Sequence, residues 1–322
     1  MTRKRKLAVL AAVIVLAIAA VALLRLRGGE EEPAQPPLTD SRVVESDAEQ
    51  TYTAISYDNG QVNLSFARDE AGAWYWVDDP GFPLDGAYLE EMSQRIVDLH
   101  PMQTLTDADL ETCGLAEPAS SLRATAPDGK ETVLLFGKTA SDGSYYVKRA
   151  DGEEVYVVSP ELRESMDKGI YQLAKLPELP ALTGESLTAV RVKGPEQETK
   201  FAVKTGEDGR TVWRFGSVDV TEDERASAVA SELAGLTFTA CVDYRPSDEA
   251  VQLCGLNQPH ATVTVWYLAA NGTETTFKFS LGNLTAAGDG YYTRREGDTT
   301  IYSVDKDAVT ALLAVARDGF AA

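Results

Sequence analysis

Side chains that perform covalent or metal chemistry are scarce in this sequence. Its 322 residues contain three cysteines and two histidines. His100 and His260 are far apart and each adjoins a proline. Two isolated imidazoles do not supply the ligands of a zinc site. Neither stands in a recognisable pattern with a cysteine, so we expect no catalytic cysteine and no metal.

The three cysteines leave two interpretations open. Cys241 and Cys254 lie 13 residues apart and could form a disulfide outside the cytoplasm. The interpretation that the sequence favours is that these two and Cys113 are small buried side chains that replace other apolar residues.

Carboxylates offer a second route to chemistry. A hydrolase would need two of them in one cleft, drawn from acidic spots such as Asp78-Asp79, Asp107/Asp109 and residues 151–154. Helix capping and surface solvation explain most of these residues. The sequence contains no G-x-S-x-G, H-E-x-x-H, P-loop, G-x-G-x-x-G or EF-hand motif. We therefore expect no enzyme and no cofactor, with a carboxylate-based hydrolase as an alternative.

Aromatic side chains are the candidates for ligand or partner contact. In Tyr145-Tyr146 and Tyr291-Tyr292, alternation along a strand turns one tyrosine of each pair toward the core. Trp76 and Trp213 match in an internal repeat and are predicted core residues, which leaves Trp74 as a surface candidate. The predicted contact residues are Trp74, Tyr146 and Tyr292. They favour a glycan- or peptide-binding module as another alternative.

Composition limits the class of protein. Hydrophobic residues make up 44% and charged residues 25%, which is typical of a folded chain. The 30 Lys and Arg face 50 Asp and Glu, for a net charge of −20. Binding to a phosphate backbone requires clustered cations, so we expect no nucleic-acid partner.

The N-terminus has the pattern of a membrane anchor. Four basic residues at positions 3–6 precede an uninterrupted apolar run at residues 7–24. As a helix this run would be about 27 Å long, enough to cross the lipid core. The basic cluster predicts a cytoplasmic N-terminus, with the bulk of the chain extracytoplasmic. We favour a retained signal anchor over residues 1–27 rather than a cleaved signal peptide.

An acidic, proline-containing segment follows the anchor. Residues 28–50 include Glu30-Glu31-Glu32 and three prolines, with few large apolar side chains. Such a composition buries too little surface to offset the entropy of ordering, and it predicts a disordered stalk.

The rest of the chain contains an internal repeat. Residues 53–55 match 188–190, and Phe66-Ala67 matches Phe201-Ala202, both at an offset of 135. The elements Cys113-Gly114-Leu115-x-x-Pro118 and Cys254-Gly255-Leu256-x-x-Pro259 match at an offset of 141. The offset only increases, in steps that fall in turn-like stretches. We predict two domains, residues 51–180 and 187–316.

Each predicted unit combines antiparallel strands with a long and a short helix, an α+β pattern. The expected strands are 51–57, 61–67, 73–77, 121–127, 131–137, 144–150 and 153–158, then 187–193, 198–204, 211–215, 261–269, 273–281, 290–296 and 299–304. Leu89, Met92 and Ile96 lie on one face of the first long helix. Thr221 with Glu224 predicts a capping box at the start of the second. Short helices are expected at 159–166 and 305–315.

This arrangement resembles the uncharacterised bacterial domain-of-unknown-function family 4340. The anchor, the duplicated unit, the x-Gly-Leu-x-x-Pro elements and the stretches from Gly137 to Tyr146 and from Gly282 to Tyr292 carry the resemblance. The family has no established activity, so the resemblance implies no catalytic residues. Its members often accompany a gliding-motility-type ABC transport system, which implies permease and ATPase subunits as partners.

These observations lead to one functional hypothesis. We expect a single-pass, non-enzymatic accessory or scaffold protein of the cell envelope, held in the lipid by residues 7–24. ABC-transport association is the partner that the family resemblance implies.

Overall fold

The computed structural model describes residues 42–44, 51–206 and 209–320. The first repeat begins with the strands β1 (Ala54–Asp58), β2 (Asn63–Arg68) and β3 (Trp74–Trp76) and the helix α2 (Gly86–Val97). It continues with β4 (Gln103–Leu105), α3 (Leu110–Cys113), β5 (Ser120–Thr125), β6 (Glu131–Thr139), β7 (Tyr145–Arg149), β8 (Val155–Val158), α4 (Glu161–Glu164) and the 3-10 turn η1 (Ile170–Leu173).

The second repeat follows the same order, except that it adds the strand β12 and places its 3-10 turn before the closing helix rather than after it. It begins with β9 (Leu187–Lys193), β10 (Glu198–Thr205), β11 (Thr211–Phe215), β12 (Val218–Asp219), α5 (Glu224–Ala234), β13 (Phe238–Asp243) and α6 (Asp248–Leu253). It ends with β14 (Ala261–Leu268), β15 (Glu274–Leu284), β16 (Gly290–Arg295), β17 (Ile301–Asp305), η2 (Asp307–Val309) and α7 (Thr310–Asp318). These elements confirm the predicted α+β class.

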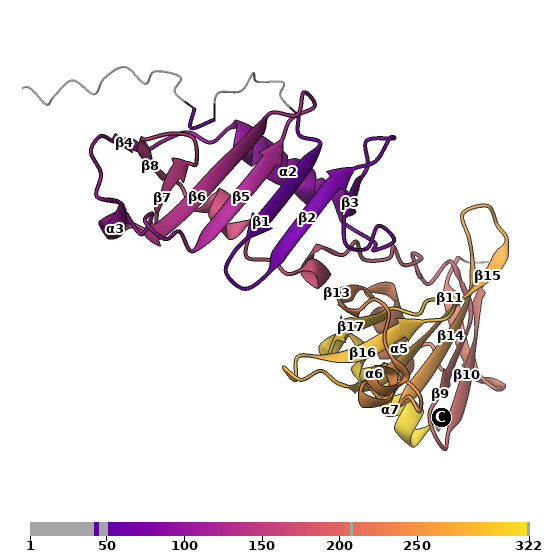
Figure 1. Ribbon diagram of the computed structural model, residues 1–322. Helices are drawn as coiled ribbons and strands as arrows, with labels where there is room; N and C mark the ends of the chain where they lie inside the picture. The colour runs from indigo at the N-terminus through magenta and orange to yellow at the C-terminus, as the bar shows by residue number, and fades with distance from the viewer. Residues whose placement is uncertain (1–41, 45–50, 207–208, 321–322) are drawn as a thin grey trace, which may run out of the picture. The chain divides into compact units, whose positions relative to one another are not determined.

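The two antiparallel sheets share one strand order, which agrees with the internal repeat (Figure 1). The first is β3-β2-β1-β5-β6-β7-β8-β4, and the second is β12-β11-β10-β9-β14-β15-β16-β17-β13. The registers also agree: Ala54 pairs with Ala67, and Ala189 pairs with Ala202. The second sheet differs only by the added edge strand β12.

Each sheet buries one face beneath its helices. Helix α2 begins after Asp85, whose carboxylate accepts a hydrogen bond from the Ala87 amide, and it buries Leu89, Met92 and Ile96 in the first core. In the second repeat, α5 and α7 pack on the sheet in the same way, with Val229 and Leu233 of α5 and Leu312 and Val315 of α7 in the core.

A smaller apolar cluster lies on the other face of each sheet, at the end where β8 or β17 runs. Cys113 and Leu115 pack there with Val155 in the first repeat. Cys254 and Leu256 pack with Ile301 in the second repeat. Along β8, Val155 alternates with Tyr156 and Val158, which pack in the main core. The small cluster and the main core therefore lie on opposite faces of the sheet.

The x-Gly-Leu elements close α3 and α6 against the sheets. Gly114 and Gly255 adopt the left-handed conformation, with φ of 71° and 69°. The amide of Leu115 then bonds back to the Leu110 carbonyl at 2.7 Å, and that of Leu256 to the Val251 carbonyl at 3.0 Å.

Six elements were absent from the sequence-based prediction: β12, the 3-10 turn η1 and four that form matching pairs in the two repeats. The edge strands β4 and β13 pair with β8 and β17. The helices α3 and α6 have only four and six residues. All four occur at equivalent places in the two repeats, after the long helix of each.

The predicted capping box of the second long helix is wrong. The N-cap of α5 is Asp223, whose carboxylate accepts hydrogen bonds from the amides of Arg225 and Ala226. The Thr221 hydroxyl instead accepts from the Trp213 amide at 3.0 Å and donates to Asp219 at 2.7 Å, so it orders the preceding turn.

The predicted stalk is wrong at two residues. Val43 and Val44 are 1% and 3% exposed and pack in the first core, and the Val43 amide bonds to the Leu99 carbonyl. Arg42 is also described, and the remaining residues of the 28–50 stalk and the anchor at 7–24 lie outside the described residues. Among described residues, no helix has both the length and the hydropathy to span a membrane.

Candidate functional site

One surface of the second sheet belongs neither to the main core beneath α5 and α7 nor to the small cluster around Cys254. The strands β9, β10, β14 and β15 bury alternate residues against α5 and α7 and turn the others outward. We call this outward surface the open face. Its cationic side chains are Arg191, Lys193, Lys200, Lys204 and Lys278, joined by Arg214 of β11. A chain with a net charge of −20 thus gathers cations on one side of one sheet.

Three of these cations stand in a single line across the strands. Lys200 pairs with Arg191 between β10 and β9. Thr264 of β14 pairs with Arg191 on one side and with Lys278 of β15 on the other. Neighbouring strands are about 4.8 Å apart, so these four side chains form a close row. We call Lys200, Arg191, Thr264 and Lys278 the cationic row.

The charges of the row are only partly neutralised. The Lys278 ammonium donates to the Glu296 carboxylate at 2.5 Å. Within the described part of the chain, Arg191 and Lys200 instead approach the Trp266 ring, each at 5.3 Å from its centroid. A ring face attracts cations without cancelling their charge. Trp266 therefore holds two positive side chains in place and leaves them able to bind an anion.

A groove of about 750 Å³ is built on this surface. The floor contains Arg191, Lys193, Thr262 and Thr264, and the remaining lining residues are Gly194, Pro195, Glu198, Gln258, Pro259, His260 and Lys278. The β9–β10 turn and the segment that enters β14 lie at the same end of the strands, where Lys193 pairs with both Glu198 and Thr262, and together they form one end of the groove. His260 is oriented by a 3.2 Å hydrogen bond between its Nε2 and the Asn283 side-chain oxygen.

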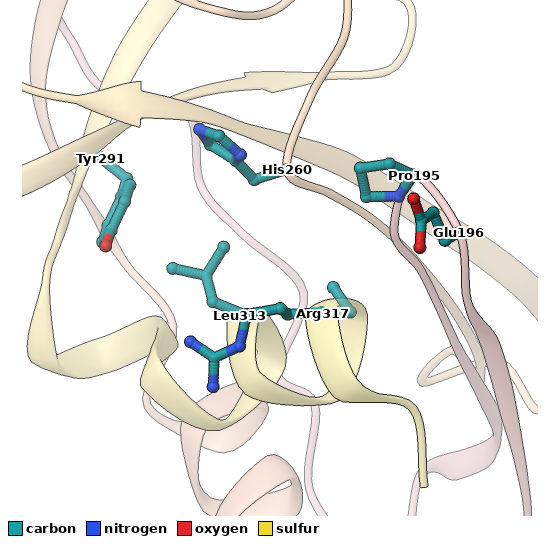
Figure 2. Close-up of a pocket in the computed structure, with 7 residues that line it drawn as sticks. Pro195, Glu196, His260, Tyr291, Leu313 and Arg317 are labelled. Carbon is teal, nitrogen blue, oxygen red and sulfur yellow. The ribbon is translucent and has the colours of Figure 1, made fainter.

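A smaller pocket of about 390 Å³ adjoins the groove and shares Pro195 and His260 with it. Figure 2 shows Leu313 and Arg317 of α7 across from His260 and Tyr291. The Arg317 guanidinium is paired with the Asp318 carboxylate at 2.7 Å. The unneutralised Arg191 therefore lines the groove, and this pocket adjoins the groove at Pro195 and His260.

The first repeat lacks this chemistry at the equivalent positions. Cross-strand pairing aligns Ser56 and Ser65 with Arg191 and Lys200. It also aligns Arg123 with Thr264 and Val133 with Lys278. The Arg123 guanidinium is bonded to Glu131. The two repeats share a framework and differ in the side chains they turn outward.

The sequence-based prediction missed this row. Its local signal is the alternation of buried residues with Arg191 and Lys193 in β9, and with Lys200 and Lys204 in β10. Sequence spacing does not reveal that Lys278, 78 residues beyond Lys200, completes the row. That placement follows from strand pairing.

The predicted contact residue Trp74 is buried, which corrects its assignment to the surface. It is 8% exposed, its indole donates to Glu90 at 3.2 Å, and Arg68 stacks on its ring at 4.3 Å. Trp74 pairs with Arg68, as Trp213 pairs with Val203. The counterpart of Trp213 is therefore Trp74 rather than Trp76, because matching Trp76 with Trp213, at an offset of 137, shifts the strand by two residues.

The two predicted contact tyrosines occupy equivalent places. Tyr146 packs against the small cluster of Cys113 and Leu115, and Tyr292 against that of Cys254 and Leu256. Both are partly exposed. The structure does not bring either of them into the groove.

The alternative of a disulfide between Cys241 and Cys254 does not hold, and all three cysteines are free and buried, as the favoured interpretation predicted. Cys241 pairs with Tyr302 and packs in a cluster with that residue. Cys254 packs with Ile301, which precedes Tyr302 in β17. Adjacent residues of a strand point to opposite faces of the sheet, so Ile301 and Tyr302 lie on different faces. The sheet thus separates the two thiols. Burial raises the pKa of all three, that of Cys241 to about 11.

Among the described residues, no three His, Cys, Asp or Glu side chains are grouped so as to hold a metal ion. His100 and His260 lie in different repeats.

Comparison with known proteins places the chain in a family. It matches the family described as domain of unknown function (DUF4340) over residues 74–253 and again over 221–318. The two matches cover most of the chain, so it belongs to that family. No curated protein and no solved structure matches it.

Proposed function

We propose that this protein is a membrane-anchored, extracytoplasmic accessory subunit of a cell-envelope complex, and that it acts by binding rather than by catalysis. The open face of the second repeat is its binding surface. The observation that carries this proposal is the contrast between Arg191 and Lys200 and their counterparts Ser56 and Ser65, which occupy the same cross-strand pair of the other sheet.

Duplication explains how such a surface arises. Two copies of one framework supply two stable sheets, and the outward residues of a strand can change without disturbing the core. In the first repeat the equivalent row is Ser65, Ser56, Arg123 and Val133, and its one cation, Arg123, is paired with Glu131. In the second it carries charge at adjacent positions, which is unfavourable for folding alone because like charges opposite each other destabilise a sheet.

Attachment to the membrane rests on the sequence. Residues 7–24 supply the apolar span, and the basic cluster before them sets its orientation. The family resemblance adds permease and ATPase subunits of a gliding-motility-type ABC transport system as the partners to look for.

Crosslinking in native membranes tests this function. Full-length protein is crosslinked in its host, purified under denaturing conditions and analysed by mass spectrometry. A variant that lacks residues 50–315 but keeps the N-terminal anchor is the control. We expect transport-system subunits with the full chain and their loss with the deletion. Recovery of the protein alone from both samples would refute the accessory role.

A further inference from the structure

The groove beside the cationic row has a chemistry that defines its ligand. We propose that it binds an anionic saccharide chain, whose carboxylate or phosphate groups pair with Arg191 in the groove and with Lys200 beside it, and whose hydroxyls bond to the groove lining. This inference rests on the proposed binding role of the open face and specifies what that face binds.

Charge is the first argument. Arg191, Lys193 and Lys200 have no carboxylate partner among the described residues, and Trp266 fixes two of them from one side. Guanidinium and ammonium groups form their strongest hydrogen bonds with carboxylates and phosphates. A ligand with several anionic groups would neutralise the whole row, whereas a single ion would contact only part of it.

The polar lining of the groove is the second argument. Thr262 and Gln258 each offer both a donor and an acceptor, and Glu198 adds an acceptor beside Lys193. Such a mixture suits a ligand rich in hydroxyl groups. The Glu198 carboxylate would repel a ligand made only of anionic groups, whereas it can accept hydrogen bonds from the hydroxyls of a saccharide.

The same lining disfavours an acidic protein segment. Protein interfaces are anchored by aromatic and large apolar side chains that fill pockets. The groove contains no such side chain, since its only apolar lining residues are Gly194, Pro195 and Pro259.

The shape of the site disfavours a lipid surface. A bilayer presents an extended plane, and its attraction for a protein comes from basic residues that can approach that plane together. Arg191 and Thr264 instead lie in a groove, one end of which is formed by the β9–β10 turn together with Gln258–His260. A chain of sugars can enter this groove, and a membrane plane cannot.

Saccharide binding is tested with the full-length protein in detergent micelles. Isothermal titration is performed with polygalacturonate as the carboxylated probe, a glycerol-phosphate-substituted oligosaccharide as the phosphorylated probe and dextran as the neutral one. We expect binding of at least one acidic probe, weakening as salt is added, and no binding of dextran. The acidic probe that binds more tightly identifies which anionic group the ligand carries.

The variant Arg191→Ser/Lys200→Ser removes the charges that carry the inference. Serine occupies both equivalent positions of the first repeat, so the framework accepts it. We expect its Kd for the acidic probe to rise at least tenfold. The control Lys130→Ser/Lys306→Ser loses the same charge from exposed residues off the open face and should bind like the wild type. Lys278→Val, which introduces the residue found at the equivalent Val133, tests the far end of the row independently and should also weaken binding.

Three results would overturn the inference: no binding of either acidic probe, equal binding of dextran, or an unchanged Kd in both row variants. Titration with vesicles of anionic lipid and with poly-glutamate completes the test. Preferential binding of either would replace the saccharide by a membrane or an acidic protein. Each of these outcomes leaves the crosslinking result, and with it the accessory role, to stand or fall separately.

Discussion

Gly282 and Cys254 meet so closely that a Cβ on the glycine would overlap the carbonyl oxygen of the cysteine. The same relationship holds between Gly137 and Cys113 in the first repeat. Each glycine lies where the register of its strand shifts, between Leu281 and Leu284 in β15 and at the matching place in β6. The absent side chain lets the x-Gly-Leu turn rest on the strand backbone, which explains why the turn and the glycine occur together in both repeats.

Gly282→Ala should therefore destabilise the protein by about 2–3 kcal/mol, because a methyl group can fit only if backbone moves. Gly86→Ala is the matched control. Its Cβ would meet Trp74 at 3.8 Å, an ordinary contact, and it lies in the first turn of α2. We expect that control to gain up to about 1 kcal/mol from higher helix propensity. Urea denaturation measures both, and equal effects would contradict the close approach.

Local pattern in the sequence was enough to predict most strands. The alternation of β9 and β11 gives their observed limits, Leu187–Lys193 and Thr211–Phe215, because one face of each strand is buried and the other is wet. The short elements were missed for the opposite reason. β4 has three residues, Gln103–Leu105, and none is buried, so no periodicity marks it.

The candidate site depended on non-local information. Arg191, Lys200 and Lys278 come into one row only through the pairing of four strands, β10, β9, β14 and β15. The error at Trp74 has a similar origin. A shift of one pleat keeps an aromatic residue aligned with Trp213, and only the cross-strand partners decide which tryptophan is the counterpart.

Trp74→Ala should lower the free energy of unfolding by about 3–5 kcal/mol, the usual cost of removing a buried tryptophan. Trp266→Ala is the comparison, since that ring is only partly buried and faces the groove side of the sheet. We expect a smaller loss there, about 1 kcal/mol or less. Guanidinium denaturation of both variants checks the order, and a larger loss at Trp266 would contradict the assignment of the two rings.

In each repeat a charged side chain links the long helix to the short helix that follows the last strands, and the charge is negative in the second repeat and positive in the first. Glu232 of α5 accepts hydrogen bonds from the amides of Ala311 at 2.6 Å and Leu312 at 3.0 Å. The buried residues Met92 and Ile96 of α2 correspond to Val229 and Leu233 of α5, which makes Arg95 the counterpart of Glu232. Arg95 donates a hydrogen bond to the Glu161 carbonyl at 2.7 Å. Glu232→Ala leaves two amides without their acceptor and should cost about 1–3 kcal/mol. Glu232→Arg should cost more, because it brings a cation to amide donors, and thermal denaturation would show the order.

Burial raises the pKa of Glu232, and the hydrogen bonds from Ala311 and Leu312 oppose that rise. The folded state therefore takes up this proton at a higher pH than the unfolded state. Its contribution to stability is complete below the unfolded pKa and is lost as pH rises through the folded one. Glu232→Gln cannot ionise, so the stability difference between variant and wild type should shift in favour of Gln between about pH 4 and pH 7. A constant difference would exclude a raised pKa.

The buried thiols should react slowly. Because burial raises the pKa of Cys113, Cys241 and Cys254, little thiolate forms at about pH 7.5. We expect maleimide to label the native protein slowly and to add three labels once urea unfolds it, without a reductant. Intact-mass spectrometry counts the labels. A single label in the unfolded, unreduced protein would indicate a disulfide, in disagreement with the separation of Cys241 and Cys254 by the sheet.

The cationic row should impose a cost on folding that a ligand relieves. Arg191 and Lys200 are like charges directly opposite each other, an arrangement that destabilises antiparallel strands. Arg191→Ser/Lys200→Ser should therefore raise the free energy of unfolding by a few tenths of a kcal/mol, or leave it unchanged, whereas most double substitutions lower it. Added salt should stabilise the wild type more than the variant, because it screens this repulsion. Urea denaturation at about 0.05 and 0.5 M NaCl gives both quantities. A clear loss of stability in the variant would mean that these cations stabilise the folded sheet, and it would contradict the view that they are kept for binding an anion.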